Sequence, residues 1–341
     1  MSSISQFPTI QCWLGIDVAK LKLDVALLNA KGKLKSKVFS NDPAGLRSLA
    51  AWLIERGAGP ADCHVCMEAT GPYSEAPATA LADGGWPVSV VNPLRVKGYS
   101  QSLLQRNKTD SADAGLLAQF CKLHTPELWT APSLQVRQLR ALVDRLQVLK
   151  DIAQAEGNRL QINADNAVLK ASIQSHLDWL DSCIKALQKQ IDDHIDAHPD
   201  LAKDAALLAS IPGLGAVTVA KVLGYLGDVR RFDNAKALSA FLGVTPKRKE
   251  SGSSLKGRSS FSRAGHTAMR KALYMPALVA LRHNPLVKTF GERIRLTGLA
   301  PKAVVGACMH KLAMLIYGVL RSGQPFDVNF EKKKLAFQDG I

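Results

Sequence analysis

Apolar residues recur every three or four positions in two long runs between residues 133 and 198. This spacing places apolar side chains along one narrow stripe of a helix, while polar residues occupy the remaining surface. We therefore predict two long coiled-coil helices within residues 129–204, with a break near 163–166, whose stripes pair within the chain or across a dimer. The stripes are Leu139, Leu142, Leu146, Leu149 and Ala153, followed by Ile173, Leu177, Leu180, Ile184, Leu187 and Ile191.

The segment before these helices has the pattern of an α/β layer fold. Residues 11–28 alternate as in a β-hairpin, and the next stretch, "AKGKLKSKVFSND", continues as a turn and a third strand. An amphipathic helix is expected over 43–57, a buried strand in "CHVCMEAT", a helix over about 75–84 and a strand in "WPVSVVNP". Three meandering strands followed by alternating helix and strand predict an α/β domain over residues 1–128.

The residues after the long helices are expected to form a mostly helical domain over 205–326, followed by a basic tail over 327–341. Pro212-Gly213-Leu214-Gly215 separates two helical patterns, as in a helix-hairpin-helix. In that motif the hairpin amides around Gly213 and Gly215 and a helix N-terminus meet a nucleic-acid phosphate. We favour this contact with a nucleic-acid backbone; an ordinary helix–helix turn is the alternative.

A basic, serine-rich segment follows within this domain. Residues 245–273 contain eight Lys or Arg residues against one acid, Glu250. Apolar helical patterns flank the segment on both sides, so a loop held over a core is expected rather than a free tail. Such a loop suits phosphodiester chemistry, and composition does not choose among its serines, which are Ser251, Ser253, Ser254, Ser259, Ser260 and Ser262.

The net charge of +15 and the pI of about 9.6 indicate an acidic partner, most simply nucleic acid. No apolar run approaches the roughly 20 residues that a membrane span needs, and the N-terminus lacks a signal-peptide layout. We therefore expect a cytosolic protein with no membrane partner. Its six cysteines are expected to be reduced. Cys63 and Cys66 are expected to lie in one strand and to face opposite sides of the sheet.

Four acids stand at the ends of apolar elements: Asp17, Glu68, Asp110 and Asp113. Asp110 and Asp113 are three residues apart, which puts both on one helix face. Carboxylates that meet at one sheet edge repel each other unless a cation lies between them. Mg²⁺, with Mn²⁺ as a substitute, is the expected ion because it prefers oxygen ligands, and Arg106 and Lys108 are placed to face a phosphate.

Each acid also has a structural explanation when it is taken alone. Asp17 can be a strand-end residue, and Asp110 can be a helix N-cap. Asp113 can be a solvated acid that the helix dipole favours in the first turn. The order of strand, strand and helix, together with the basic charge, favours the metal site over these separate explanations.

Five motifs now occur in order: "GIDVAKLKLDVAL", "MEATGPY", "RNKTDSADA", "SIPGLGAVTVAKVL" and "FLGVTPKRKESGSS". Together they resemble the DEDD-type insertion-sequence transposases, the Piv-like group described as bridge-RNA-guided recombinases. The resemblance spans roughly residues 11–326. It implies a RuvC-like (RNase H-like) domain, a coiled coil and a C-terminal transposase domain, with the DEDD positions on Asp17, Glu68, Asp110 and Asp113.

The resemblance also implies a mechanism. The family's catalytic serine falls on Ser251, which would attack a DNA phosphodiester and hold the strand as a serine ester. A structured guide RNA would pair with donor and target DNA, and the protein would act as a dimer or as a tetramer built from two dimers. The predicted nucleic-acid contacts, beside Arg106, Lys108, Gly213 and Gly215, are Lys247, Arg248, Lys249, Lys256, Arg258 and Arg263.

Two other functions compete with the recombinase. A metal-dependent nuclease of the Holliday-junction type would use water, and Ser251 would then be an ordinary loop residue. A basic coiled-coil protein that only packages nucleic acid would not need the acids. Tyr274, a weaker nucleophile candidate, stands in an apolar pattern that predicts a place in the core, and His266 is a further open candidate for an acid or a phosphate donor.

Overall fold

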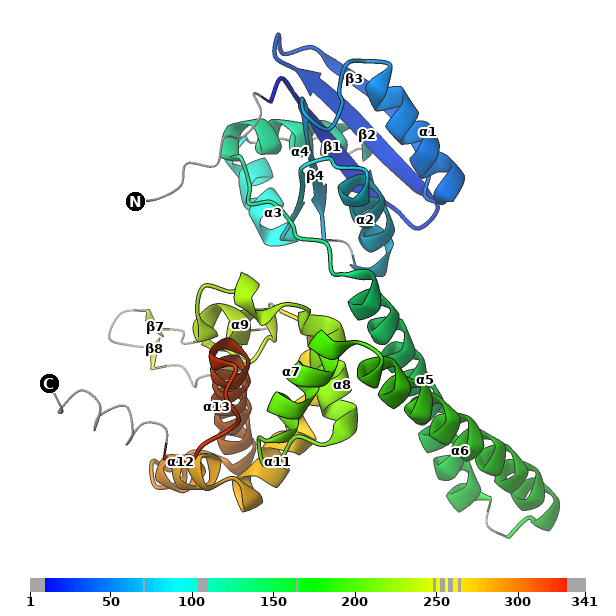
Figure 1. The fold of residues 1–341 in the computed structure, drawn as a ribbon, viewed down its shortest axis with the longest axis vertical. Helices are drawn as coiled ribbons and strands as arrows, with labels where there is room; N and C mark the ends of the chain where they lie inside the picture. Colours follow the sequence, from blue (N-terminus) through cyan, green and yellow to red (C-terminus); the bar gives the residue numbers. More distant parts are fainter. Residues whose placement is uncertain are drawn as a thin grey trace, which may run out of the picture. The chain divides into compact units, whose positions relative to one another are not determined.

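The computed structural model describes residues 10–69, 71–103, 110–163, 165–247, 250–251, 255–256, 260–262 and 265–329. The chain divides into two compact units, Met1–Ala131 and Pro132–Ile341. The first is a mixed α/β unit and the second is mostly helical, with the elements shown in Figure 1. The predicted change from α/β to helical structure is confirmed.

A five-stranded sheet with the order β3-β2-β1-β4-β5 forms the centre of the N-terminal unit. The first three strands are antiparallel neighbours, whereas β4 and β5 run parallel to β1. This is the meander followed by alternating strands that the sequence predicts. The strands are β1 (Cys12–Val18), β2 (Lys22–Asn29), β3 (Leu34–Ser40), β4 (Cys63–Glu68) and β5 (Val88–Val91).

Helices cover both faces of this sheet (Figure 1). The core on one face contains residues of α1 (Pro43–Ile54) and α2 (Glu75–Asp83), and α2 follows a short 3-10 helix, η1 (Gly71–Ser74). The core on the other face contains residues of α3 (Pro93–Ser102) and α4 (Asp110–His124). Cys63 belongs to the first core and Cys66 to the second, so the prediction that they face opposite sides is confirmed, and both thiols are free.

Helix α3 was not expected from the sequence. Its N-terminus is well specified, because the Asn92 side chain accepts a hydrogen bond from the Leu94 amide and Pro93 occupies the first turn. Only Val96 is buried among its side chains. The helix therefore lacks the apolar periodicity that reveals most surface helices.

Helix α4 and strand β1 approach each other very closely. A Cβ atom added at Gly15 would lie 2.0 Å from the Ala114 carbonyl oxygen and 2.4 Å from the Ala118 amide nitrogen. The backbone of α4 therefore lies directly on β1, and no side chain larger than hydrogen fits between them. This contact fixes the helix that carries two of the four predicted acids.

The C-terminal unit begins with a long helical hairpin, α5 (Leu134–Ile162) and α6 (Ala167–Asp196). The helices are antiparallel, since His194 near the end of α6 hydrogen-bonds through Nε2 to the carbonyl of Gln135 at 2.9 Å. The predicted break falls where expected. Near the base of the hairpin most stripe residues are buried, and toward the tip Ala153, Ile173 and Leu177 are half-buried. Ile162, the last residue of α5, is exposed. The coiled coil and the dimer contact stay predictions.

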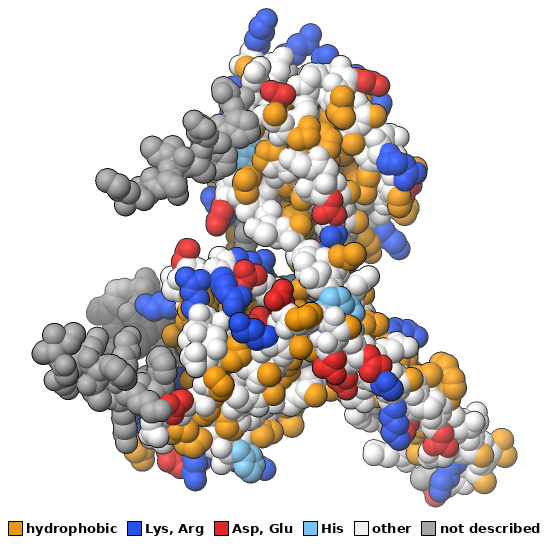
Figure 2. Space-filling view, viewed as in Figure 1, with side chains coloured by type: hydrophobic (Ala, Val, Ile, Leu, Met, Phe, Trp, Pro, Cys, Tyr) orange, Lys and Arg blue, Asp and Glu red, His pale blue; other side chains and the backbone are white. Residues whose placement is uncertain are grey.

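The outer surface of the hairpin carries charges of both signs, which lie side by side in Figure 2. Lys185 pairs with Asp181 at 2.7 Å and Lys189 pairs with Asp193 at 2.8 Å, each one helical turn apart. Exposed pairs of this type stabilise a helix by only about 0.3–0.5 kcal/mol. Lysines and aspartates therefore alternate along this part of α6.

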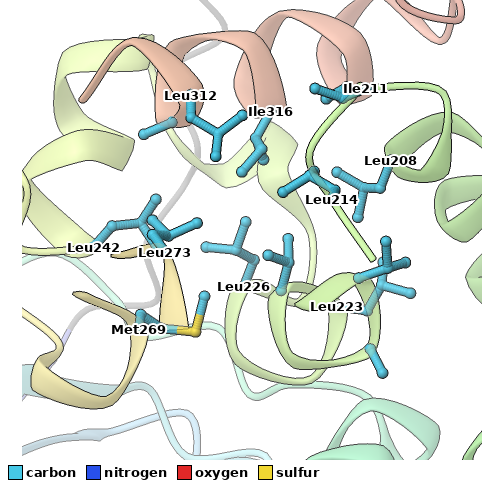
Figure 3. Packing of buried hydrophobic residues seen from close by; sticks show 14 of the residues in the cluster. Leu208, Ile211, Leu214, Leu223, Leu226, Leu242, Met269, Leu273, Leu312 and Ile316 are labelled. Carbon is cyan, nitrogen blue, oxygen red and sulfur yellow. The ribbon is translucent and has the colours of Figure 1, made fainter. Parts of the chain in front are cut away.

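Helices and four two-residue strands build the rest of this unit. Its core brings together side chains from helices α5 to α13, and Leu208, Leu223, Leu242, Met269 and Leu312 point toward one another in Figure 3. The elements are α7 (Pro199–Ala209), α8 (Ala216–Leu226), η2 (Val229–Arg231), α9 (Ala235–Phe241), β6 (Pro246–Lys247), β7 (Glu250–Ser251), β8 (Leu255–Lys256), β9 (Ser260–Phe261), α10 (Thr267–Ala272), α11 (Tyr274–His283), α12 (Pro285–Arg295) and α13 (Pro301–Ser322).

Two details of this unit differ from the sequence predictions. Helix α13 has 22 residues and, by length and composition, could cross a membrane, although no such apolar run was expected. Over half of its most apolar stretch is buried inside the unit, as in the core helix of a soluble protein.

Tyr274 is 40% exposed, so its predicted place in the core is wrong. It opens α11, and its side chain turns outward while Pro276 and Ala277 face the core.

Replacement of Gly15 by valine should destabilise the N-terminal unit by about 1–3 kcal/mol, because the new side chain would displace α4 from β1. Chemical denaturation followed by circular dichroism measures the change. Gly98→Ala is the matched control, since a Cβ at Gly98 in α3 meets open space and should stabilise the helix by about 0.5–1 kcal/mol. Equal stability of Gly15→Val and wild type would contradict the close packing.

Candidate active site at one edge of the sheet

Strands β1 and β4 bring Asp17 and Glu68 to the same edge of the sheet. In the parallel ladder, Gly15 pairs with Cys66 and Ile16 with Met67, so Asp17 and Glu68 are the next residues along the two strands. Side chains alternate between the faces of a sheet. Asp17 therefore shares the face of Gly15, Glu68 shares the face of Cys66, and this common face is the one that α4 covers.

Three contacts fix the direction in which α4 crosses this face. Lys122, near the end of the helix, lies 4.9 Å from the ring centroid of Trp13 at the start of β1. The Cys121 thiol donates to the carbonyl of His64 at 3.8 Å. The middle of the helix meets Gly15. The N-terminal turn of α4, with Asp110 and Asp113, therefore points toward the edge that carries Asp17 and Glu68.

The loops that follow the two acidic strands are tied to each other. The Asn41 side-chain amide donates to the carbonyl of Ala19, in the turn after Asp17, at 2.9 Å. It also donates to the carbonyl of Tyr73, in the segment after Glu68, at 3.2 Å. One side chain thus holds both turns at the acidic edge.

The acids are the oxygen ligands that Mg²⁺ prefers, although the described side chains do not complete its coordination shell. Asp113 is half-buried, Asp110 starts α4, and the side chain of Asp110 lies outside the described part of the structure. Among the described side chains, no three Asp, Glu, His or Cys residues are grouped closely enough to hold a metal. Mg²⁺ usually takes one or two carboxylates and completes its shell with water and substrate phosphates. Carboxylates on two strands and a helix supply that kind of donor set.

A buried polar cluster anchors the other end of α4 to the sheet. The Ser89 hydroxyl on β5 lies 2.9 Å from the carbonyl of Pro126 and 2.8 Å from that of Glu127, just after α4. His64 Nε2 lies 2.8 Å from the same hydroxyl. Since a hydroxyl has one hydrogen to donate, which goes to a carbonyl, His64 donates to Ser89. Burial lowers the pKa of His64, which favours the neutral ring.

Strand pairing also brings an acid to this face that the sequence analysis did not single out. Asp24 on β2 pairs directly with Asp17 on β1, and Lys22 lies two residues before it. The spacing in "KLD" is the signal that could have revealed it, because Lys22 and Asp24, two residues apart, share one face of a strand and Leu23 takes the other.

The predicted serine belongs to the other unit. Ser251 lies on β7, which pairs with β8, and the flanking strands β6 and β9 pair with each other. The base of this hairpin is fixed to the core, because the Ser262 amide donates to Thr245 at 2.9 Å and Phe261 packs against Gly306 of α13. The predicted loop over a core therefore contains two short antiparallel strand pairs, β6–β9 and β7–β8, which we call the serine hairpin. The Ser251 side chain lies outside the described atoms.

Several predicted contacts cannot be placed on this framework. Arg106, Lys108, Arg248, Lys249, Arg258 and Arg263 lie outside the described residues, and Lys247 and Lys256 are described only as backbone of β6 and β8. His266 follows the serine hairpin, with its ring 5.0 Å from that of Tyr225. Burial lowers the pKa of His266.

The turn between α7 and α8 has the compact form that the sequence indicates. Gly213 has a φ of 110°, and a Cβ there would lie 2.8 Å from the Cβ of Ala280 on α11. The buried Asn284 side chain donates to the carbonyl of Pro212 at 3.3 Å. Gly215 precedes α8, and no side chain caps that helix. Contact of this turn with nucleic acid stays a prediction.

Comparison with known proteins identifies the class. Residues 14–167 match a DEDD family model described as "Transposase", and residues 205–292 match the model "Transposase IS116/IS110/IS902 family". The chain is 33% identical over 321 residues to the pilin gene-inverting protein of Moraxella bovis, covering 92% of this chain and 97% of that protein. It is 25% identical to the transposase for insertion sequence element IS1111A of Coxiella burnetii, over 79% of this chain and 78% of the relative.

These matches cover both units and nearly the whole length of a relative. They identify the protein as a DNA transposase or recombinase of the DEDD type. The chain belongs to the IS110 family of transposases.

The pKa of His64 should lie below its ordinary value of 6.5 in the folded protein. The unfolded chain then binds a proton on His64 at a higher pH than the native chain does. The contribution of His64 to stability is therefore full above pH 6.5 and declines as the pH falls toward the folded pKa. NMR titration of histidine-labelled protein, with His64→Gln for assignment, measures the pKa directly. A folded value above 6.5 would contradict the buried, neutral ring.

Proposed function

We propose that this transposase cuts and rejoins DNA through a serine ester, with Asp17, Glu68, Asp110 and Asp113 holding Mg²⁺. The convergence of β1, β4 and the N-terminal turn of α4 on one sheet edge is the observation that carries the metal assignment. When bound, Mg²⁺ supplies Lewis-acid polarisation of the scissile phosphate. The carboxylates hold the ion, and the N-terminus of α4 adds a favourable dipole for their negative charge.

The covalent step uses Ser251. Its Oγ attacks phosphorus, and an Oγ–P bond forms while the bond between phosphorus and a deoxyribose oxygen breaks. The serine proton leaves Oγ, and the released deoxyribose oxygen takes up a proton. The ester keeps the energy of the phosphodiester, so attack by another DNA hydroxyl can rejoin the strand.

The basic residues of the serine hairpin have a separate task in this proposal. Lys247, Arg248, Lys249, Lys256, Arg258 and Arg263 offset the charge that develops on the phosphate. Arg106 and Lys108 face the phosphate from the acidic side. The Gly213–Gly215 turn contacts the DNA backbone through its amides.

The serine and the acids belong to different compact units, with the α5–α6 hairpin at the start of the second. We propose that Ser251 of one subunit meets the acids of another, in a dimer that assembles into a tetramer through coiled-coil contacts. A RuvC-like domain over 1–128, a coiled coil over 129–204 and a transposase domain over 205–326 are the proposed parts, with a basic tail over 327–341.

We propose that a structured guide RNA determines which DNA sequences are recognised, and that donor and target DNA are the substrates. The high positive charge of the chain supports binding to both nucleic acids. We place the protein in the bacterial cytoplasm at the nucleoid. The Moraxella relative is named for gene inversion, and we add inversion of a DNA segment as a second candidate reaction.

Wild-type protein, Mg²⁺, labelled donor and target DNA and the transcript that flanks the gene should give a protein–DNA adduct on a denaturing gel. Ser251→Ala should abolish the adduct because it removes the nucleophile. Asp17→Asn should reduce its formation by about 10²-fold or more, because the carboxylate no longer holds the ion that stabilises the transition state. Ser253→Ala, two positions along the chain, is the matched control and should behave as wild type.

The alternatives give different results in this assay. Cleavage without an adduct, unaffected by Ser251→Ala, would establish a metal-dependent nuclease that uses water. DNA binding without cleavage, unaffected by Asp17→Asn, would indicate a packaging protein. Omission of the transcript tests the guide RNA, and an invertible segment in place of the donor tests inversion.

A further inference from the structure

The β1–β2 hairpin places a lysine and a second acid beside Asp17. Asp24 pairs directly with Asp17 across the two antiparallel strands, which puts both on the face that α4 covers. Lys22 and Asp24 are two residues apart on β2, and Leu23 between them points into the core on the opposite face. Asp17, Lys22 and Asp24 therefore form one polar group at the acidic edge.

The side chain of Asp24 is buried and paired. Asp24 is 7% exposed, and its Oδ2 lies 3.0 Å from the Nζ of Lys22. A buried carboxylate is costly unless a cation or hydrogen bonds compensate it, and two carboxylates directly opposite on neighbouring strands repel each other. The ion pair compensates Asp24 and at the same time holds the lysine in one orientation.

The lysine differs from its partner in exposure. The side chain of Lys22 is 46% exposed, whereas that of Asp24 is 10% exposed. An ammonium group has three hydrogens to donate, so it can keep its contact with Asp24 and bind a phosphate oxygen as well. A phosphate that approaches the acids at this edge meets negative charge, and a fixed cation beside them offsets that repulsion.

We propose that Lys22 binds the DNA phosphate at the acidic site and that Asp24 is a positioning residue that holds Lys22 there. This inference rests on the proposed function, because it takes the acidic edge as the place where DNA reacts. Lys22 acts on the phosphate, while the carboxylate of Asp24 acts only through Lys22. Asp24 is therefore not a metal ligand, although it lies next to one.

The test uses full-length Lys22→Met, Lys22→Arg and Asp24→Asn, with the double variant Lys22→Met/Asp24→Asn. Lys31→Met is the matched control, because Lys31 is an exposed lysine in the turn at the opposite end of β2. Three quantities are measured: the salt dependence of duplex DNA binding in EDTA, the rate of adduct formation at saturating DNA, and the Mg²⁺ concentration for half-maximal rate. Thermal unfolding reports on the fold of each variant.

Loss of one phosphate contact should reduce the slope of log K against log salt by about 0.9 in Lys22→Met. The same variant should form the adduct about 10²-fold more slowly, and Lys22→Arg should retain part of the rate. Asp24→Asn should slow the reaction less. The double variant should be no slower than Lys22→Met, because Asp24 acts only through Lys22. The Mg²⁺ requirement should not change.

Other results would overturn the inference. If Lys22→Met shows the wild-type salt slope and rate, Lys22 and Asp24 form only a structural ion pair. A higher Mg²⁺ requirement in Asp24→Asn, with the double variant slower than Lys22→Met, would make Asp24 a metal ligand. If Lys22→Met fails to fold because Asp24 is left unpaired, the double variant, which lacks both charges, still tests the phosphate contact. If wild type forms no adduct, the proposed function fails, whereas the salt slope still reports on Lys22.

Discussion

The contact between α4 and Gly15 determines the geometry of the acidic edge. Backbone atoms of Ala114 and Ala118 lie where a Cβ of any other residue would be, so the helix sits directly on β1. The Ser89–His64 cluster holds the segment after the helix, and Asn41 holds the two turns at the opposite edge. With both ends fixed, the first turn of α4 lies where the acidic strands end.

The two faces of the sheet carry different kinds of side chains. The face under α1 and α2 is apolar along its length, with Leu14, Ile16, Leu23 and Val25 in one core. The face under α4 is apolar only in its middle, where a hydrogen bond with Cys66 and burial raise the pKa of the Cys121 thiol. Its polar side chains lie at the two ends, with the Ser89–His64 cluster at one end and Asp17, Asp24 and Glu68 at the other.

Much of this arrangement follows from local sequence patterns. Alternation predicted the strands, and the position of Asp17 and Glu68 at strand ends predicted that they would meet, because parallel strands end at the same edge. Helix α3 was missed because it buries one side chain and is specified by its cap instead. Tyr274 was misplaced because apolar neighbours do not determine which way the first residue of a helix points. The pairing of Asp24 with Asp17 depends on the register between strands, which the pattern of one strand does not contain.

Because α13 comes last in the chain, the C-terminal unit completes its core only late in synthesis. All strands and helices of the N-terminal unit precede Ala131, so this unit can fold while the rest is translated. The C-terminal core needs Leu312 and Ile316 of α13, the last helix in the described part of the chain. A chain that ends early therefore exposes the apolar surfaces of α8 and α11 to chaperones and proteases. Only a completed chain therefore has the folded core against which Phe261, at the base of the Ser251 segment, packs.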